Sequence, residues 1–224
     1  MTTNTPYQDP KREIAGLTAA IEKRALIWLA AHLPEWVMPD HLTALGLLAL
    51  LVGGLAYTWS GSVPALLFVV NGALVVNWFG DSLDGTLARY RQKQRPRFGY
   101  YVDHVVDAFG ALFLLGGLIL SGLVTPAVGA TLLVAYYLFG INSYLATHVL
   151  GRFKLSFGPV GGTELRILLA AVNTVVYAMP GLHAFGRDWL LFDILVVGAT
   201  VALCITLLRS VAQVTHTLYV EERV

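Results

Sequence analysis

Long runs of apolar residues most restrict what this chain can fold into. Several of them approach the about 20 residues that an α-helix needs to cross ~30 Å of hydrocarbon. Of the 224 residues, 56% are hydrophobic and only 13% are charged, and the mean hydropathy is +0.66. A water-soluble domain of this size would be far less apolar. We therefore expect an all-α, polytopic membrane protein.

Six apolar segments are close to the length of a membrane-spanning helix. Residues typical of helix starts stand before or at four of them: Asp40, Ser62, Thr125 with Pro126 behind it, and Thr163. No repeat, linker or low-complexity tract divides the segments, which indicates one six-helix membrane domain over residues 39–224. The predicted spans are His41–Trp59, Pro64–Tyr90, Phe98–Leu120, Pro126–Leu150, Glu164–Met179 and Trp189–Val211.

A charged helical pattern precedes the spans, over Lys11–Leu33. Its apolar residues, among them Ile14 and Trp28, lie near one stripe, while Lys, Arg and Glu occupy much of the remaining surface. This pattern is typical of an interfacial amphipathic helix. A soluble helix packed on a partner is the alternative. Residues 1–38 would then comprise a polar tail and this helix.

Almost all basic residues fall on one side of a six-span arrangement. Cytoplasmic loops carry the excess of Lys and Arg, so this asymmetry predicts that both termini are cytoplasmic. The net charge of +1 indicates no particular partner, and we expect no nucleic-acid partner. The single cysteine, Cys204, excludes a disulfide framework and a Cys-rich metal site. Only Arg187 is predicted on the opposite side. The basic residues predicted on the cytoplasmic side are Lys11, Arg12, Lys23, Arg24, Arg89, Arg91, Lys93, Arg95, Arg97, Arg152, Lys154, Arg166, Arg209 and Arg223.

Four aspartates lie within this otherwise apolar sequence, as the pairs Asp81/Asp84 and Asp103/Asp107. Residues three or four apart share one face of a helix, and a basic, proline-containing turn separates the pairs. Two antiparallel helices would therefore direct four carboxylates into one gap. Such a cluster repels itself unless cations neutralise it, and oxygen-only ligands favour Mg²⁺, Mn²⁺ or Ca²⁺. An ion-pair cluster with Arg89 and its neighbours is the alternative.

These residues resemble the signature of the CDP-alcohol phosphotransferase (CDP-alcohol phosphatidyltransferase) family of integral membrane enzymes. The signature reads D-x2-D-G-x2-A-R, then eight or nine residues, then G-x3-D-x3-D. The resemblance implies transfer of a substituted phosphate group from a CDP-linked alcohol to a hydroxyl acceptor, with release of CMP, in phospholipid biosynthesis. The eight fixed positions are matched by Asp81, Asp84, Gly85, Ala88, Arg89, Gly99, Asp103 and Asp107.

The resemblance also implies roles for individual residues. Two Mg²⁺ or Mn²⁺ ions would be held by Asp81, Asp84 and Asp103. Asp107 would take the proton from the attacking hydroxyl and could also contact a metal. Family members are commonly dimers, so a homodimer is expected, with a site that opens to the cytoplasm and touches the bilayer lipids. The pocket for the nucleotide would be lined by Asp81, Gly85, Ala88, Arg89 and Gly99.

His104 directly follows Asp103, and an Asp-His pair here resembles the choline and ethanolamine phosphotransferase branch. A histidine beside the metal site could act as an alternative base near neutral pH; a polar helix residue without a catalytic role is the other interpretation. Tyr100 departs from that branch, in which glutamate is usual. A CDP-diacylglycerol-dependent phosphatidyltransferase is therefore the alternative function.

Two residues before the signature are further candidates for nucleotide binding. The segment Pro39–Thr43 is similar to the family's Pro-Asn-x-x-Thr pattern, with Asp40 in place of Asn. Thr43 could contact the nucleotide, whereas Asp40 is expected to be an N-cap. Asn77, one turn before Asp81, could hydrogen-bond either a ligand oxygen or a neighbouring helix.

The connection between the fourth and fifth spans also carries charged residues. Its glycines and proline predict a loop with a re-entrant character. Arg152, Lys154 and Arg166, with Glu164 beside them, could bind the acceptor or a lipid headgroup. The alternative is that these cations are attracted to anionic lipid without a specific role.

Two other functions are compatible with clustered aspartates. An intramembrane prenyltransferase also binds a diphosphate through metal ions, but six spans are too few for that larger bundle and the signature's small residues would go unexplained. A divalent-cation transporter would use the aspartates as a pathway, but no second acidic set lies deeper or opposite.

Overall fold

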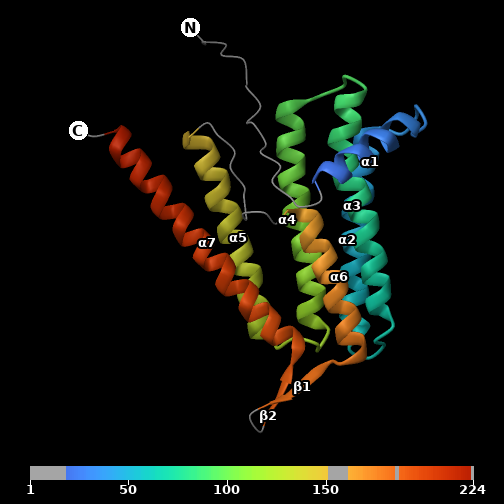
Figure 1. Ribbon diagram of the computed structural model, residues 1–224, viewed down its shortest axis with the longest axis vertical. Helices are drawn as coiled ribbons and strands as arrows, with labels where there is room; N and C mark the ends of the chain where they lie inside the picture. The colour runs from blue at the N-terminus through green and yellow to red at the C-terminus, as the bar shows by residue number, and fades with distance from the viewer. Residues whose placement is uncertain (1–18, 151–160, 185–186, 223–224) are drawn as a thin grey trace.

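The computed structural model describes residues 19–150, 161–184 and 187–222. These residues form a bundle of helices with one short hairpin at its lower end (Figure 1). The elements are α1 Ala19–His32, α2 Pro39–Ser60, α3 Leu66–Tyr90, α4 Pro96–Leu120, α5 Pro126–Leu150, α6 Gly162–Ala178, β1 Gly181–Ala184, β2 Arg187–Leu190 and α7 Leu191–Glu221.

Five of the described helices, α2, α3, α4, α5 and α7, are long and apolar enough to cross a membrane. The expected all-α polytopic class is confirmed, but the count of six spans is not. The predicted fifth span corresponds to α6, whose 17 residues extend for about 26 Å, less than the ~30 Å of a hydrocarbon core. In Figure 1, α5 ends at the upper end of the bundle and α7 begins at the lower end, so the chain returns between them through α6.

The last predicted span begins and ends at the wrong residues. Trp189 lies in strand β2, which pairs antiparallel with β1, and the helix runs from Leu191 to Glu221, beyond the predicted end at Val211. Strands of four residues are too short to show an alternating pattern in the sequence. The residues after Val211 are more polar, but helical hydrogen bonding continues through them to Glu221.

The expectation that Asp40 caps α2 is wrong. The N-cap is Met38, and Pro39 is the first helical residue, a position that suits the fixed φ of proline. Asp40 therefore lies inside the first turn, where its carboxylate forms an ion pair with Arg95 at the start of α4.

The other three predicted helix starts have mixed outcomes. Helix α5 begins at Pro126, as expected. Ser62 does not cap α3, which begins only at Leu66, and Thr163 lies inside α6, which begins at Gly162. The hydroxyl of Thr163 is instead engaged with α1, as described below.

Helix α2 organises the site-bearing helices, because α3 and α4 both pack closely against it. A Cβ on Gly80 of α3 would be 2.5 Å from the carbonyl oxygen of Leu42 on α2. A Cβ on Gly54 of α2 would collide with the backbone carbonyl of Phe113 on α4. Glycine thus lets the helix backbones approach more closely than any side chain would allow. The position of α2 sets the separation of the two helices that carry the aspartates.

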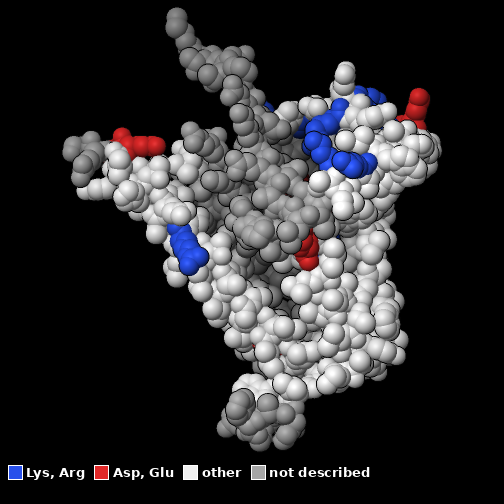
Figure 2. Space-filling view, viewed as in Figure 1, with Lys and Arg blue, Asp and Glu red and all other residues white. Residues whose placement is uncertain are grey.

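Helix α1 lies across the end of the bundle at which α3 ends (Figure 1). Its Leu26 and Ala30 are buried in one cluster with Leu83 and Leu87 of α3, which attaches α1 to the last turns of the Asp81-bearing helix. Its outer face carries Trp28, which is 61% exposed, as an interfacial helix would. On the face drawn in Figure 2, Lys and Arg side chains gather over this end of the molecule. The predicted residues 11–18 of this helix lie outside the described residues.

A buried polar network attaches α6 to α2 and α3. The Tyr57 hydroxyl donates to Oδ1 of Asn173 (2.6 Å), and Nδ2 of Asn173 donates to Oδ1 of Asn71 (2.8 Å). Asn71 in turn donates to the carbonyl oxygen of Ala170 (3.1 Å). Tyr57 and Asn173 are fully buried, and buried polar groups of this kind specify one packing arrangement when all are paired. The network holds α6 beside α3, with its first turn near Asp81.

Candidate active site

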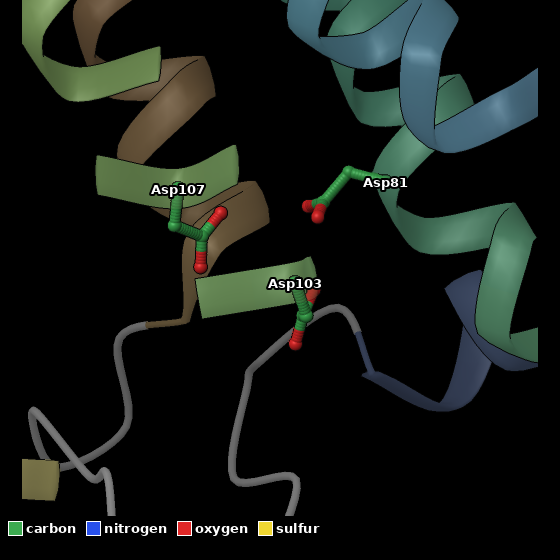
Figure 3. Close-up of side chains that lie close together, drawn as sticks. All are labelled: Asp81, Asp103 and Asp107. Atoms are coloured by element: carbon green, nitrogen blue, oxygen red, sulfur yellow. The ribbon is translucent and has the colours of Figure 1, made fainter. Parts of the chain in front are cut away.

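Three of the four signature aspartates meet between α3 and α4. Asp81 comes from α3, while Asp103 and Asp107 lie one turn apart on α4, and the three side chains lie close together (Figure 3). One oxygen from each lies within 4.8 Å of the other two. The i, i+4 spacing puts Asp103 and Asp107 on one face, and packing of both helices on α2 brings that face opposite Asp81.

This carboxylate cluster, Asp81, Asp103 and Asp107, fits the requirements of a divalent cation. Octahedral Mg²⁺ binds oxygen at about 2.1 Å, so its ligand oxygens are about 3 to 4.2 Å apart. Oxygens within 4.8 Å of one another reach that spacing with small side-chain rotations. The donors are all oxygen, the set that Mg²⁺ and Mn²⁺ prefer.

Asp84 is not part of this cluster and has separate partners. Its Oδ2 accepts a hydrogen bond from the Thr43 hydroxyl on α2 (2.6 Å), and its Oδ1 accepts one from the Gly85 N–H (2.5 Å). Its carboxylate remains close enough to experience the negative charges of Asp81 and Asp103. The prediction that Asp84 binds metal, and the prediction that Thr43 contacts nucleotide, both remain predictions.

Arg166 lies beside the carboxylate cluster. Its Nη2 donates to Oδ2 of Asp81 (2.5 Å), and its Nε donates to Oδ1 of Asn77 (2.8 Å). Nδ2 of Asn77 donates to the carbonyl oxygen of Gly46 on α2 (3.1 Å). Asn77 was expected to hydrogen-bond either a ligand oxygen or a neighbouring helix, and in the structure it bonds the neighbouring helix α2. Arg166 was expected near an acceptor or headgroup, and it is placed next to a metal-ligand candidate.

The other charged candidates of that connection are Glu164, Arg152 and Lys154. Glu164 accepts a hydrogen bond from the Gly161 N–H (2.9 Å) at the start of α6, which is a capping interaction. Arg152 and Lys154 lie outside the described residues.

The small signature residues have different surroundings. A Cβ on Gly85 would lie 3.3 Å from the Arg89 guanidinium, so a larger residue would displace that side chain. Arg89 also donates to the Thr86 hydroxyl (3.2 Å). A Cβ on Gly99 would have no described atom within 4 Å, and Ala88 is half-buried on α3. The backbone at Gly85 and Gly99 is therefore not covered by another described helix, and their roles in nucleotide binding remain predictions.

His104 adjoins the cluster from α4. Its Nδ1 donates to the carbonyl oxygen of Tyr100 (2.7 Å), because a carbonyl can only accept. Its ring packs on Tyr100 at 4.2 Å and on Tyr144 of α5 at 4.9 Å between centroids. In this geometry Nδ1 carries the proton, so any role as a base would fall to Nε2.

Sequence reasoning missed two contributors to the site. Glu22 belongs to the charged pattern of the amphipathic helix, whose sequence gives it no separate role, but it faces α3 and α6. Tyr144 was included in an apolar span, but it packs on His104. No signal in the sequence distinguishes Glu22 from the neighbouring charges. A tyrosine in a span is equally uninformative, because the residue is common near membrane interfaces.

A curated protein is similar to this chain over part of its length. This is the CDP-diacylglycerol–serine O-phosphatidyltransferase of Encephalitozoon cuniculi (strain GB-M1), which is 34% identical over 154 residues. The match covers 64% of this chain and 38% of the relative, so the chain spans well under half of that protein's length.

The family comparison covers more of the chain. The family described as CDP-alcohol phosphatidyltransferase matches residues 36–204, which include α2 to α6, both aspartate pairs and the first part of α7. Together with the five apolar helices, this match makes the protein a multi-pass integral membrane protein. The resemblance seen in the signature is confirmed: the chain belongs to the CDP-alcohol phosphatidyltransferase family.

Proposed function

We propose that this protein transfers a substituted phosphate group from a CDP-linked alcohol to a hydroxyl acceptor, releasing CMP, as a step of phospholipid biosynthesis. The observation that carries the proposal is the convergence of Asp81, Asp103 and Asp107, which come from the two halves of the family signature, within 4.8 Å. The family match over residues 36–204 supports the same reaction class.

The residues present suit the charge that this chemistry develops. One or two divalent cations held by Asp81, Asp103 and Asp107, with Asp84 adjacent, would offset negative charge on the donor pyrophosphate and in the transition state. The bond between the bridging oxygen and the distal phosphorus breaks as the acceptor oxygen bonds to that phosphorus, and CMP leaves. Asp107 is the exposed member of the cluster, so its carboxylate is the one best placed to receive the acceptor's proton.

The rest of the signature would bind the nucleotide. Arg89 offers a guanidinium near Gly85 at the end of α3, and guanidinium groups bind phosphate oxygens well. Gly99 leaves its side of α4 uncovered by the described residues. Thr43 positions Asp84 through its 2.6 Å hydrogen bond. These residues would hold the donor so that its diphosphate faces the cluster.

Two donor classes have separate support. His104, next to Asp103, favours the choline and ethanolamine phosphotransferase branch, in which the donor carries the headgroup. The relative from Encephalitozoon cuniculi is by name a CDP-diacylglycerol–serine O-phosphatidyltransferase, which favours a lipid donor and a small alcohol acceptor. We infer the reaction class for this protein and treat the donor as the variable to be tested.

The direct test is CMP release by the purified protein. Each of CDP-choline, CDP-ethanolamine and CDP-diacylglycerol is supplied with Mg²⁺ or Mn²⁺ and with diacylglycerol, serine or glycerol 3-phosphate as acceptor. Metal-dependent CMP release that requires an acceptor is the expected result, and the productive pair names the branch. Consumption of a polyprenyl diphosphate without any CDP compound would indicate a prenyltransferase. Metal flux into vesicles without nucleotide would indicate a transporter.

A further inference from the structure

Glu22 is a charged residue of α1 that faces the bundle. Its Oε1 accepts three hydrogen bonds: from Nε1 of Trp78 (2.7 Å), from the Ser82 hydroxyl (3.2 Å) and from the Thr163 hydroxyl (2.8 Å). Trp78 and Ser82 belong to α3, and Thr163 belongs to the first turn of α6. A single carboxylate oxygen therefore joins three helices.

Two of the residues attached to this oxygen are direct neighbours of the candidate active site. Ser82 follows Asp81 in α3. Thr163 precedes Arg166 by three residues, so the two lie about one turn apart on the same side of α6. Arg166 in turn donates to Asp81 at 2.5 Å and to Asn77 at 2.8 Å. The path from α1 to the carboxylate cluster thus consists of hydrogen-bonded groups and one helical turn.

Hydrogen bonds to an ionised acceptor are stronger than those between neutral groups, and a half-buried position increases their effect. The lower part of α6 is held independently by Tyr57, Asn71 and Asn173. Its first turn is held by other contacts: Thr163 joins it to Glu22 of α1, and Arg166 joins it to Asp81 and Asn77 of α3. The position of that turn should therefore respond to Glu22, whereas the rest of α6 should not.

We propose that Glu22 is a positioning residue that holds the first turn of α6 through Thr163, and so sets where Arg166 meets Asp81. The inference deepens the proposed function and rests on it for its catalytic consequence. It assigns to the interfacial helix α1 a part in the geometry of the site, in addition to its apolar packing on α3.

The experiment compares Glu22→Ala, Glu22→Gln, Thr163→Val and the double variant Glu22→Ala/Thr163→Val in the full chain. Glu35→Gln is the matched control, because Glu35 is an exposed acid just after α1. Two quantities are measured: kcat and KM for CMP release, and hydrogen exchange of the backbone amides of Leu165–Leu169. The exchange measurement requires no catalytic activity.

Glu22→Ala should lower kcat about tenfold, since small misplacement of site groups far from the chemistry is costly, and KM for the CDP donor should change less than threefold. The backbone amides of Leu165–Leu169 should exchange at least fivefold faster. The amides that follow Asn173 in α6 should exchange at an unchanged rate. Glu22→Gln, which keeps an acceptor oxygen, should restore most of both losses. Thr163→Val should lower kcat and loosen the first turn of α6 as Glu22→Ala does, although it leaves the hydrogen bonds from Trp78 and Ser82 to Glu22 in place. The double variant should be no worse than Glu22→Ala in these two measurements, because both changes break the same link to α6.

Unchanged exchange at the start of α6 in Glu22→Ala would overturn the inference, as would additive losses in the double variant. Equal effects of Glu35→Gln would also overturn it, since they would reflect a general change in charge. If the unaltered protein releases no CMP from any donor while Glu22→Ala still loosens the first turn of α6, the proposed function fails and the positioning role stands. Normal CMP release by every variant would leave the proposed function standing and remove Glu22 from it.

Discussion

Asp84 and Asp107 carry the same carboxyl group but have very different surroundings. Asp84 is half-buried and accepts hydrogen bonds from Thr43 and from its own neighbour Gly85. Asp107 is exposed within the carboxylate cluster. A fixed carboxylate is suited to holding a ligand in place, and an exposed one is suited to exchanging a proton with a substrate. The roles of Asp84 as a metal ligand and of Asp107 as a base stay predictions, and the two variants below test residues from each environment.

Replacing Asp107 with Asn should abolish turnover while the protein still folds and binds metal. Asn keeps the shape and one oxygen but cannot accept a proton, and a general base contributes about 10²- to 10⁴-fold. CMP release should fall by at least about 100-fold, while the melting temperature stays within a few degrees. Asp193→Asn is the control: Asp193 binds Thr125 at the other end of the bundle and should retain turnover. If Asp107→Asn released CMP at the wild-type rate, Asp107 would not be the base, and His104 or water would have to accept the proton.

Thr43→Val should weaken metal-dependent binding of cytidine nucleotide. Valine has the shape of threonine but cannot donate the 2.6 Å hydrogen bond to Asp84, and loss of a group that orients a metal-binding carboxylate typically costs about 10- to 100-fold in affinity. Isothermal titration of CMP in the presence of Mn²⁺ measures the change. Thr43→Ser keeps the donor and should bind within about threefold of the unaltered protein. An unaltered affinity in Thr43→Val would mean that the orientation of Asp84 is unimportant for binding.

At the scale of the helices, α2 supplies no residue to the carboxylate cluster but decides its geometry. α3 and α4 each pack on α2 through glycine contacts, and these contacts set the distance between the helices that carry Asp81, Asp103 and Asp107 (Figure 3). Small residues at such interfaces allow close backbone approach in membranes, where the hydrophobic effect adds little to helix association. The cluster is therefore sensitive to changes at positions that never touch a substrate.

Gly80→Ala should destabilise the protein and impair the site, whereas Gly72→Ala should do neither. The new Cβ at position 80 would lie 2.5 Å from the Leu42 carbonyl oxygen and 2.8 Å from the Gly46 nitrogen. These are backbone atoms that cannot rotate away, so α3 must shift at a cost of about 1–3 kcal/mol. Gly72, on the same helix, has no described atom within 4 Å of such a Cβ. Thermal unfolding in detergent and CMP release test the pair; equal melting temperatures for the two variants would contradict the packing argument.

At the scale of the whole molecule, orientation in the membrane decides which substrates reach the site. The basic turn between α3 and α4 lies at the same end as the carboxylate cluster, and the positive-inside rule predicts that this end is cytoplasmic. A cytoplasmic opening would admit soluble CDP compounds, while contact with the bilayer would admit a lipid.

Accessibility of introduced cysteines tests this orientation. In a Cys204→Ser background, Gln94→Cys in the α3–α4 turn should react with a membrane-impermeant maleimide only in inside-out vesicles. Ser62→Cys, in the exposed turn between α2 and α3, should react only in intact cells or right-side-out vesicles. Labelling with the opposite sidedness would place the site on the other face and would exclude the use of cytoplasmic CDP compounds.

Much of the candidate site could be predicted from neighbouring residues in the sequence. The pairing of Asp103 with Asp107 follows from helical periodicity, and the separation of the two aspartate pairs by a basic turn predicts antiparallel helices. Hydrophobic length likewise predicts five of the spans, since it depends only on consecutive residues. The fifth segment was predicted at nearly its true length, and the error was to count this 17-residue helix as a span. The other failures occurred where the decisive interaction is not local: the β1–β2 pairing and the ion pair of Asp40 with Arg95.

Hydrophobic length and the spacing of the aspartates were thus sufficient for the membrane class, the family resemblance and the candidate ligands, because each is a property of residues close together in the chain. Packing in three dimensions separated Asp84 from the cluster, put Arg166 beside Asp81 and turned Glu22 toward α6. Those contacts join residues from 41 to 141 positions apart, and no local pattern specifies which distant helix a side chain will meet.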